Sequence, residues 1–344
     1  MTPGGASGAE HEVDVLLVGA GPVGLFGAYY AGARGLSVAV VDSLSQLGGQ
    51  VTAMYPEKQI FDIAGLPAVS GRELVRGLRA QAGQYAPTYL LGQEAQHHEA
   101  VPVADRPDRH LVTTSTGTRV WCGAVIVTGG IGTFTPRPLP AGEEFLGRGL
   151  DYFVPDTSGY AGKDVVVVGG GDSAIDWCLM LEPIAASVTL VHRREQFRAH
   201  AASVEQVRAS RVRIITNAEV AALEGGTSVE KALVQVKNGD SQTLACQRVV
   251  AALGFTANLG PLREWGLELH DNRHLVVDSA MRTNVPGVFA AGDITDYDGK
   301  VRLIAVGFGE VATAVNNAAV HLDPEAQLFP GHSTDTPHAV PVPA

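Results

Sequence analysis

Gly19-Ala20-Gly21-Pro22-Val23-Gly24 directly follows an apolar run at residues 13–18 and precedes residues 25–34, which predict a helix. Strand, glycine turn and helix in this order give the G-x-G-x-x-G spacing a structural meaning. The first glycine permits a tight turn, the second lets backbone N–H groups approach a pyrophosphate, and the third lets helix and strand pack closely. The stretch predicts a dinucleotide site with phosphate at the positive end of a helix.

The next predicted strand, residues 37–41, ends at Asp42, which lies 23 residues after Gly19. A carboxylate here accepts hydrogen bonds from ribose hydroxyls and would repel a 2′-phosphate. Asp42 therefore favours FAD or NAD over NADP in the first site.

A second glycine turn, Gly169-Gly170-Gly171-Asp172-Ser173-Ala174, lies between a strand predicted at residues 164–168 and a helix predicted at 173–181. The same interval of 23 residues leads from Gly169 to His192, which Arg193, Arg194 and, slightly later, Arg198 follow. Guanidinium groups match the geometry of a phosphate, so this corner favours the 2′-phosphate of NADPH. A solvent-exposed basic loop is the alternative.

The chain thus repeats one α/β pattern, and we expect two Rossmann-like, three-layer nucleotide-binding domains. Further strands are predicted at residues 109–116, 119–128 and 248–253, and a helix at 307–322. Residues 134–140 are rich in proline, and residues 254–260 are loop-like. The most economical arrangement inserts an NADPH domain, residues 131–249, into an FAD domain made of residues 1–130 and 250–344.

The composition excludes several classes of protein. With 45% hydrophobic and 18% charged residues the chain should form a globular core, and no apolar run is long enough to span a membrane. We expect a cytoplasmic protein. The net charge of −11 argues against nucleic acid, and an acidic partner would need a local basic patch. Cys122, Cys178 and Cys246 are far apart, which indicates core or surface thiols and neither a disulfide framework nor a metal site.

These motifs together resemble the thioredoxin-reductase-like flavoproteins over nearly the whole chain. The segment from His192 to Ala199 is similar to the NADPH motif of that group, and Phe289-Ala290-Ala291-Gly292-Asp293 to its second flavin motif. Gly48-Gly49-Gln50 resembles the flavin-contacting loop. Where a thioredoxin reductase carries its C-x-x-C, residues 151–156 contain no cysteine, so disulfide reduction by that route is excluded.

Within the group, the chain most resembles the thioredoxin-reductase-like ferredoxin–NADP reductases, the second type of that enzyme. Tyr55-Pro56-Glu57-Lys58, the GGGDSAIDW run that begins at Gly169, and the tail triplet His332-Ser333-Thr334 carry this likeness. The resemblance implies that Tyr55 stacks on one face of the flavin and His332 on the other. It leaves open whether His332 covers the flavin of its own chain or that of a second subunit in a homodimer.

Fingerprints and resemblance together assign residues to each cofactor. The FAD residues are Gly19, Gly21, Pro22, Val23, Gly24, Asp42, Gly49, Gln50, Tyr55, Ala95, Phe134, Gly292, Asp293, His332 and Thr334. The NADPH residues are Gly169, Gly171, Asp172, Ser173, Ala174, His192, Arg193, Arg194 and Arg198.

The activity implied by the resemblance is electron transfer between NADPH and a ferredoxin or flavodoxin, in which the flavin carries the redox chemistry and the protein positions it. Two alternatives stay open. The same cofactors would serve an NADPH oxidase or quinone reductase, or a flavoprotein that binds nicotinamide and turns nothing over.

Overall fold

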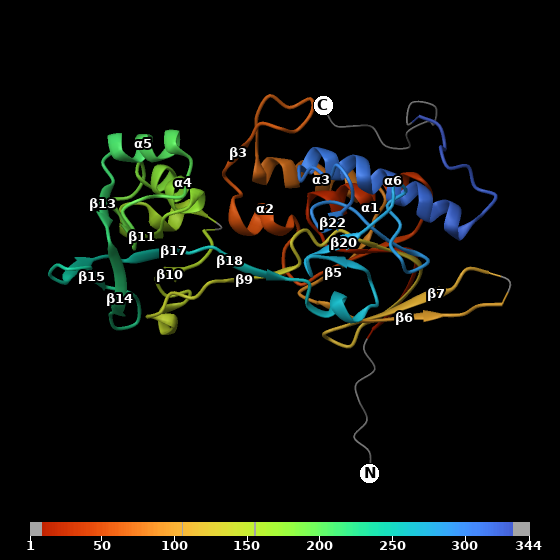
Figure 1. Ribbon diagram of the computed structural model, residues 1–344, viewed down its shortest axis with the longest axis horizontal. Coiled ribbons are helices and arrows are strands. Elements are labelled where there is room, and N and C mark those ends of the chain that lie inside the picture. Colours follow the sequence, from red (N-terminus) through yellow and green to blue (C-terminus); the bar gives the residue numbers. More distant parts are fainter. Residues whose placement is uncertain (1–8, 105, 155, 333–344) are drawn as a thin grey trace, which may run out of the picture. The chain divides into compact units, whose positions relative to one another are not determined.

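The computed structural model describes residues 9–104, 106–154 and 156–332, without the side chains of residues 133–135 and 257 (Figure 1). The chain forms two units. Unit 1 takes in the described residues of Met1–Thr52, Gln59–Thr133 and Ala257–Ala344, and unit 2 those of Ala53–Lys58 and Phe134–Thr256.

A seven-stranded sheet forms the centre of unit 1. Its order is β5-β2-β1-β8-β7-β6, with β21 beside the second half of β8. The strands β1, β2, β5, β8 and β21 are parallel, whereas β7 and β6 are antiparallel additions. The strands are β1 Glu10–Val18, β2 Val38–Asp42, β5 Thr88–Leu91, β6 Ala95–Val101, β7 Arg109–Thr114, β8 Arg119–Val127 and β21 Val288–Ala290. Val15, Leu16 and Leu17 of β1 are all fully buried, as expected of a strand covered on both faces.

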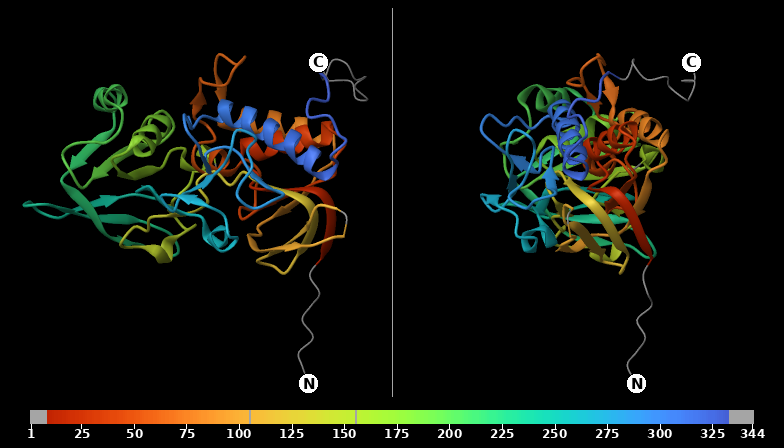
Figure 2. Two further views of the ribbon diagram at one scale, coloured as in Figure 1. Left: turned by 45° about the vertical axis from the view of Figure 1, so that its right-hand side comes forward. Right: turned by 90° about the vertical axis from the view of Figure 1, so that its right-hand side faces the viewer.

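Three helices cover one face of this sheet. Helix α1, Pro22–Ala33, lies between α3, Gly71–Gly83, and α6, Ile304–Leu322 (Figures 1 and 2). Both α1 and α6 begin three residues before their predicted starts, and in α1 the cause is Pro22, which is well suited to the first turn of a helix. The smaller elements of unit 1 are α2 Gly49–Met54, β3 Gln59–Ile60, β4 Val69–Ser70, β19 Leu269–His270, β20 His274–Val276 and β22 Thr295–Asp296, with a 3₁₀ turn at Gly260–Glu264.

Unit 2 contains the second α/β pattern. A five-stranded parallel sheet has the order β10-β17-β11-β12-β13, and a separate antiparallel sheet contains β14, β15 and β16. The elements are β10 Leu150–Asp151, β11 Asp164–Gly169, α4 Asp172–Leu181, β12 Ser187–His192, α5 Ala201–Ala209, β13 Arg213–Thr216, β14 Ala218–Glu224, β15 Lys231–Val236, β16 Gln242–Ala245 and β17 Arg248–Ala252, with 3₁₀ turns at Glu143–Phe145 and Thr157–Tyr160.

The two connecting segments differ from the prediction. Both were expected to lack regular structure, but β9, Thr133–Pro136, pairs with β18, Phe255–Asn258. Each segment satisfies backbone groups of the other, a tertiary effect that the proline and glycine content of the separate stretches did not reveal.

The three cysteines are core residues. Cys122, Cys178 and Cys246 are fully buried, and desolvation raises the pKa of each thiol to about 12. They therefore remain protonated and unreactive at neutral pH. In the described part of the chain, no helix is long and apolar enough to cross a membrane.

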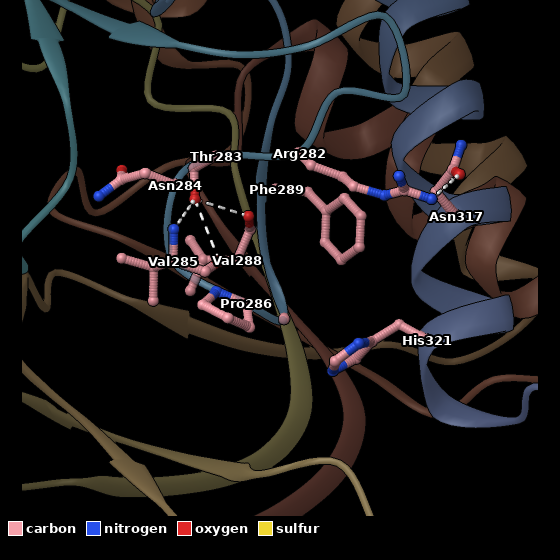
Figure 3. A pocket seen from close by; sticks show the side chains of 10 residues that line it. Arg282, Thr283, Asn284, Val285, Pro286, Val288, Phe289, Asn317 and His321 are labelled. Atoms are coloured by element: carbon pink, nitrogen blue, oxygen red, sulfur yellow. Dashed lines mark hydrogen bonds between the residues drawn. The ribbon is translucent and has the colours of Figure 1, made fainter.

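Unit 1 also buries a row of histidines. His110 is fully buried, and its Nδ1 lies 2.8 Å from Nε2 of His98. The Nε2 atoms of His110 and His321 have no hydrogen-bond partner among the described residues. His321 lines a pocket together with Arg282, Asn317 and residues 283–289 (Figure 3). This pocket lies at the C-terminal end of α6, whereas the start of that helix lies beside Val23 of the first glycine turn.

The histidine row predicts destabilisation by acid. Burial, with smaller contributions from His98 and His321, lowers the pKa of His110 from 6.5 to about 4. Burial also lowers the pKa of the neighbouring His321, with smaller opposing effects of Asp108, which raises it, and Arg282, which lowers it. His110 binds protons more weakly in the folded protein than in the unfolded chain. Its neutral form therefore contributes fully to the free energy of unfolding above pH 6.5, and this contribution is lost as the pH falls towards 4.

We expect the titration of His110 to lower the free energy of unfolding by about 2 kcal/mol between pH 7 and pH 5. Urea unfolding at the two pH values should show a smaller loss of stability in His110→Leu than in the wild type. An equal loss in both proteins would mean that another group controls acid unfolding.

Candidate dinucleotide-binding sites

The first glycine turn joins β1 to α1 in a conformation that requires glycine. Gly19 has a φ of +118°, and a Cβ on Gly24 would lie 1.9 Å from the carbonyl oxygen of Gly19. The hydroxyl of Thr128, at the end of β8, donates a 2.8 Å hydrogen bond to the same oxygen. Sheet, turn and helix are therefore locked together, and Thr128 is a contributor that the sequence did not reveal.

Gly21 lies at the mouth of the turn. A Cβ added there would meet no atom within 4 Å, and the φ of −69° would accommodate any residue, so the protein itself does not require a glycine here. No side chain caps the N-terminus of α1, and its first turn carries no acidic residue. The free space and the positive potential of the uncapped helix N-terminus both suit a bound pyrophosphate, so the turn fits a dinucleotide.

Asp42 does more than the sequence indicated. Its Oδ2 accepts a 2.6 Å hydrogen bond from the Ala20 N–H, and its Oδ1 a 2.8 Å bond from the Leu44 N–H. Burial raises the pKa of Asp42, and these two bonds oppose that shift. The carboxylate braces the glycine turn, and its remaining lone pairs are available to a ribose hydroxyl.

The loop before α2 closes over the same turn. The Gly48 N–H donates a 2.8 Å bond to the carbonyl oxygen of Ala20, and a Cβ on Gly49 would lie 3.0 Å from the Cα of Gly21. The side chain of Gln50 lies beside Gly130, where a Cβ would approach its Nε2 to 2.6 Å. Gly49 and Gln50 are thus beside the first glycine turn, although more than 20 residues separate them from it in sequence.

A buried ion pair holds the Gly292-Asp293 segment. Glu310 of α6 accepts a 2.7 Å bond from the Gly292 N–H, and Lys300 donates a 2.9 Å bond to the Gly292 carbonyl. Lys300 Nζ and Glu310 Oε1 are 2.5 Å apart, with only 3% and 4% of their side chains exposed, and the Tyr297 hydroxyl donates to the same Oε1. No motif pointed to this group in the sequence, although an acid within the apolar run of α6 was a usable signal.

Asp293 itself is half-buried. Burial raises its pKa, which Lys300 and Arg302 lower. Beside it, the start of α6 packs closely on α1, because a Cβ on Gly307 would lie 2.5 Å from Val23. Gly292 and Asp293 therefore share one neighbourhood with the first glycine turn.

The second glycine turn repeats this design in unit 2. A Cβ on Gly171 would again meet nothing within 4 Å, and no side chain caps α4. Asp172 lies in the first turn of α4, but its Oδ1 accepts the His200 N–H at 2.8 Å. Ser173 and Ala174 follow as the next residues of α4. The open turn fits a second pyrophosphate.

The basic loop after β12 is fastened to this turn. The Arg198 N–H donates a 2.8 Å bond to the Gly170 carbonyl, and the side chains of Arg193, Arg194 and Arg198 are exposed. His192 is buried instead, stacked on Phe197 with ring centroids 5.1 Å apart. The loop beside the second glycine turn therefore carries three exposed cations, and the buried His192 supports this loop.

Four further flavin contacts were predicted, at Tyr55, Phe134, His332 and Thr334. Tyr55 is half-buried in the segment Ala53–Lys58, which groups with unit 2, where Lys58 pairs with Asp176 at 2.8 Å. Phe134 lies in β9, and its side chain is outside the described residues, as is the whole of Thr334. His332 is exposed, with its ring 5.1 Å from that of Phe329. Ala95, in contrast, is buried at the start of β6 in unit 1.

Comparisons with known proteins agree with this architecture. The model of the pyridine nucleotide-disulphide oxidoreductase family matches residues 13–318. The thioredoxin reductase of T. acidophilum is similar in structure, with a TM-score of 0.71 and 26% identity over 92% of this chain and 100% of that one. The Lactococcus lactis thioredoxin reductase, 23% identical with a TM-score of 0.68 over 90% and 99% of the two chains, shares the fold. The chain belongs to the pyridine nucleotide-disulphide oxidoreductase family.

Closer relatives define its branch. A ferredoxin–NADP reductase of Salinispora tropica is 62% identical over 325 residues, which cover 94% of this chain and 99% of that protein. The ferredoxin–NADP reductase of Frankia alni is 63% identical over 321 residues, 93% of this chain and 98% of that one. Within its family, the chain groups with the ferredoxin–NADP reductases.

Proposed function

We propose that this protein is an FAD-dependent oxidoreductase that transfers electrons between NADPH and a ferredoxin. One observation carries the proposal: two open glycine turns lie in separate units, and the corner residues are an acid, Asp42, in one and arginines in the other. The names of the close relatives support the same activity. A flavodoxin as alternative carrier and a cytoplasmic location are further parts of the proposal.

The two units then divide the work. We assign FAD to the domain of residues 1–130 and 250–344 and NADPH to residues 131–249. FAD, when bound, supplies the conversion of a hydride into two separate electrons. The chain's own part is to hold the flavin dinucleotide at Gly21, Asp42 and Asp293, and to select the phosphorylated nicotinamide with Arg193 and Arg194.

Disulphide chemistry, which the family's description includes, is not part of the proposal. Residues 151–156 hold no cysteine, and the three thiols of the chain are buried and remote in sequence. Electrons that leave the flavin therefore have no protein thiol to accept them and must pass to an external carrier.

Steady-state assays with NADPH separate the possible acceptors. The proposal predicts that ferredoxin or flavodoxin is reduced with a far higher kcat/KM than quinone or oxygen. Preferred reduction of quinone or oxygen would replace it with an oxidase or quinone reductase. No turnover with any acceptor would indicate a binding protein.

We propose that the protein is a homodimer in which the C-terminal tail of one subunit covers the flavin of the other. Arg34, which ends α1, donates bonds of 3.0 and 3.1 Å to the carbonyls of Gln327 and Leu328 and one of 2.6 Å to Asn316. This anchor is the length of α1, about 18 Å, from the first glycine turn. Only three residues lie between Leu328 and His332, so the position favours cover of a second subunit's flavin over that of its own.

Two truncations test this role of the tail. Removal of all residues after Pro330 should alter the flavin spectrum and raise peroxide formation relative to carrier reduction, because the stacked imidazole is lost. Truncation after Thr336 is the matched control and should change little. Wild-type behaviour in the shorter protein would show that His332 is an ordinary surface residue.

A further inference from the structure

We propose that the outward face of α3, together with the tip of the β3–β4 hairpin, is the docking surface for a small iron–sulphur electron carrier with an acidic face. The inference rests on the proposed function, because it concerns the partner of that same reaction. Charge, exposure and position relative to the flavin-binding loop each support it.

Helix α3 presents a stripe of arginines to solvent. Arg72, Arg76 and Arg79 are spaced i, i+4, i+7, so they lie on one side of the helix, and all three are exposed. Leu74, Val75 and Leu78 lie on the opposite, buried side. The single acid of the helix, Glu73, closes a capping box with Ser70, which leaves a net positive face.

This stripe is unusual in a chain with a net charge of −11. Several other surface arginines are neutralised by neighbouring carboxylates, in pairs such as Arg109–Glu12, Arg208–Glu205, Arg211–Glu182 and Arg302–Asp296. Among the described residues, neither Arg76 nor Arg79 forms an ion pair. The same holds for Arg193 and Arg194, to which we assign an anionic ligand. We infer that the exposed arginines of α3 also bind an anionic partner.

Exposed apolar side chains lie on the hairpin that leads into α3. The hairpin of β3 and β4 ends at Ser70, the N-cap of α3, and its tip carries Phe61 and Leu66 (Figure 1). Phe61 is 72% exposed, more than any other large hydrophobic residue in the described chain, and Leu66 is 42% exposed. Asp62 is the one acid at this tip. An exposed aromatic on the hairpin that leads into an arginine-bearing helix gives the composition of a protein interface rather than of ordinary surface.

The buried side of α3 connects this surface with the flavin site. Val75 packs against Gly48, where an added Cβ would lie 2.8 Å from its Cγ2. Gly48 in turn holds the first glycine turn through Ala20. A carrier on the outer face would be separated from the flavin-binding loop by about one helix diameter, 10–12 Å. The surface therefore lies about one helix diameter from the loop that we assign to FAD.

Charge reversal on α3 tests the proposal in the FAD-loaded protein. Arg76→Glu/Arg79→Glu is compared with Arg106→Glu/Arg273→Glu, a control in unit 1 with the same change of net charge at exposed sites. We expect KM for a purified acidic ferredoxin at low salt to rise about tenfold or more in the first protein and less than about twofold in the control. Salt should weaken ferredoxin reduction by the wild type and by the control, but hardly affect the α3 variant.

Two further measurements keep docking separate from catalysis. NADPH-dependent ferricyanide reduction, which needs no protein docking, should be unchanged in every variant. Direct titration of ferredoxin into the oxidised enzyme should show weaker binding for the α3 variant and also, independently of salt, for Phe61→Ser.

The proposal is overturned if the α3 variant and the control lose ferredoxin affinity equally, if neither loses it, or if the wild type binds no acidic carrier. Wild-type ferricyanide activity without ferredoxin turnover would refute the proposed acceptor. The titration would still decide whether α3 binds the carrier.

Discussion

Replacing Arg193 and Arg194 together by alanine should raise KM for NADPH by about a hundredfold and leave KM for NADH nearly unchanged. Each charge-assisted hydrogen bond to a phosphate contributes about 1.5–3 kcal/mol, which is tenfold or more in affinity. Both guanidinium groups are exposed on a loop that the Arg198 N–H fastens to the second glycine turn. The 2′-phosphate is the only group that distinguishes the two nucleotides, so the loss must be specific to NADPH.

A matched control comes from the same unit. Arg208 and Arg211 are also exposed, but they pair with Glu205 and Glu182. Their double alanine variant removes the same charge and should leave both nucleotides unaffected. If the preference for NADPH over NADH persists in Arg193→Ala/Arg194→Ala, the phosphate is bound elsewhere.

Gly21→Val should abolish retention of FAD while leaving the apoprotein folded. The φ of −69° is compatible with valine, and the space at its Cβ position is free of protein atoms, so the substitution fills only the volume intended for the pyrophosphate. The measurements are the flavin content of the purified protein and the thermal midpoint of the apoprotein. The midpoint should differ little from that of the wild-type apoprotein.

Two other glycines give this experiment its controls. Gly171→Val should keep FAD but lose reduction by NADPH, because the second turn is open in the same way. Gly24→Ala should lower the thermal midpoint itself, since its Cβ would lie 1.9 Å from the Gly19 carbonyl. Full FAD content in Gly21→Val would place the flavin pyrophosphate away from α1.

The sequence predicted the fold well because its decisive features are local. Two glycine turns, each between a strand and a helix, define two nucleotide-binding folds. About 23 residues after each turn begins, the end of the next strand is acidic in the first fold and basic in the second. Elements that depend on long-range pairing were missed. The connecting segments form β9 and β18 only because they meet each other, which neither stretch indicates alone.

The places of the candidate site residues in the fold were predictable to a similar degree, whereas their binding roles remain predictions. Gly21, Asp42 and Gly171 lie where the spacing placed them, but the assignment of His192 did not anticipate its burial under Phe197. The clamp of Lys300 and Glu310 on Gly292 joins residues that no motif connects. The contacts assigned to Tyr55 and His332 rest on resemblance and remain predictions.

Anaerobic titration of the FAD-loaded protein with NADPH, followed by oxidised ferredoxin, tests the central claim most directly. We predict that NADPH bleaches the flavin at far lower concentration than NADH does, and that ferredoxin then restores the oxidised flavin spectrum as it is itself reduced. A flavin that NADPH fails to bleach, or a bleached flavin that passes no electrons to ferredoxin or flavodoxin, would contradict the account.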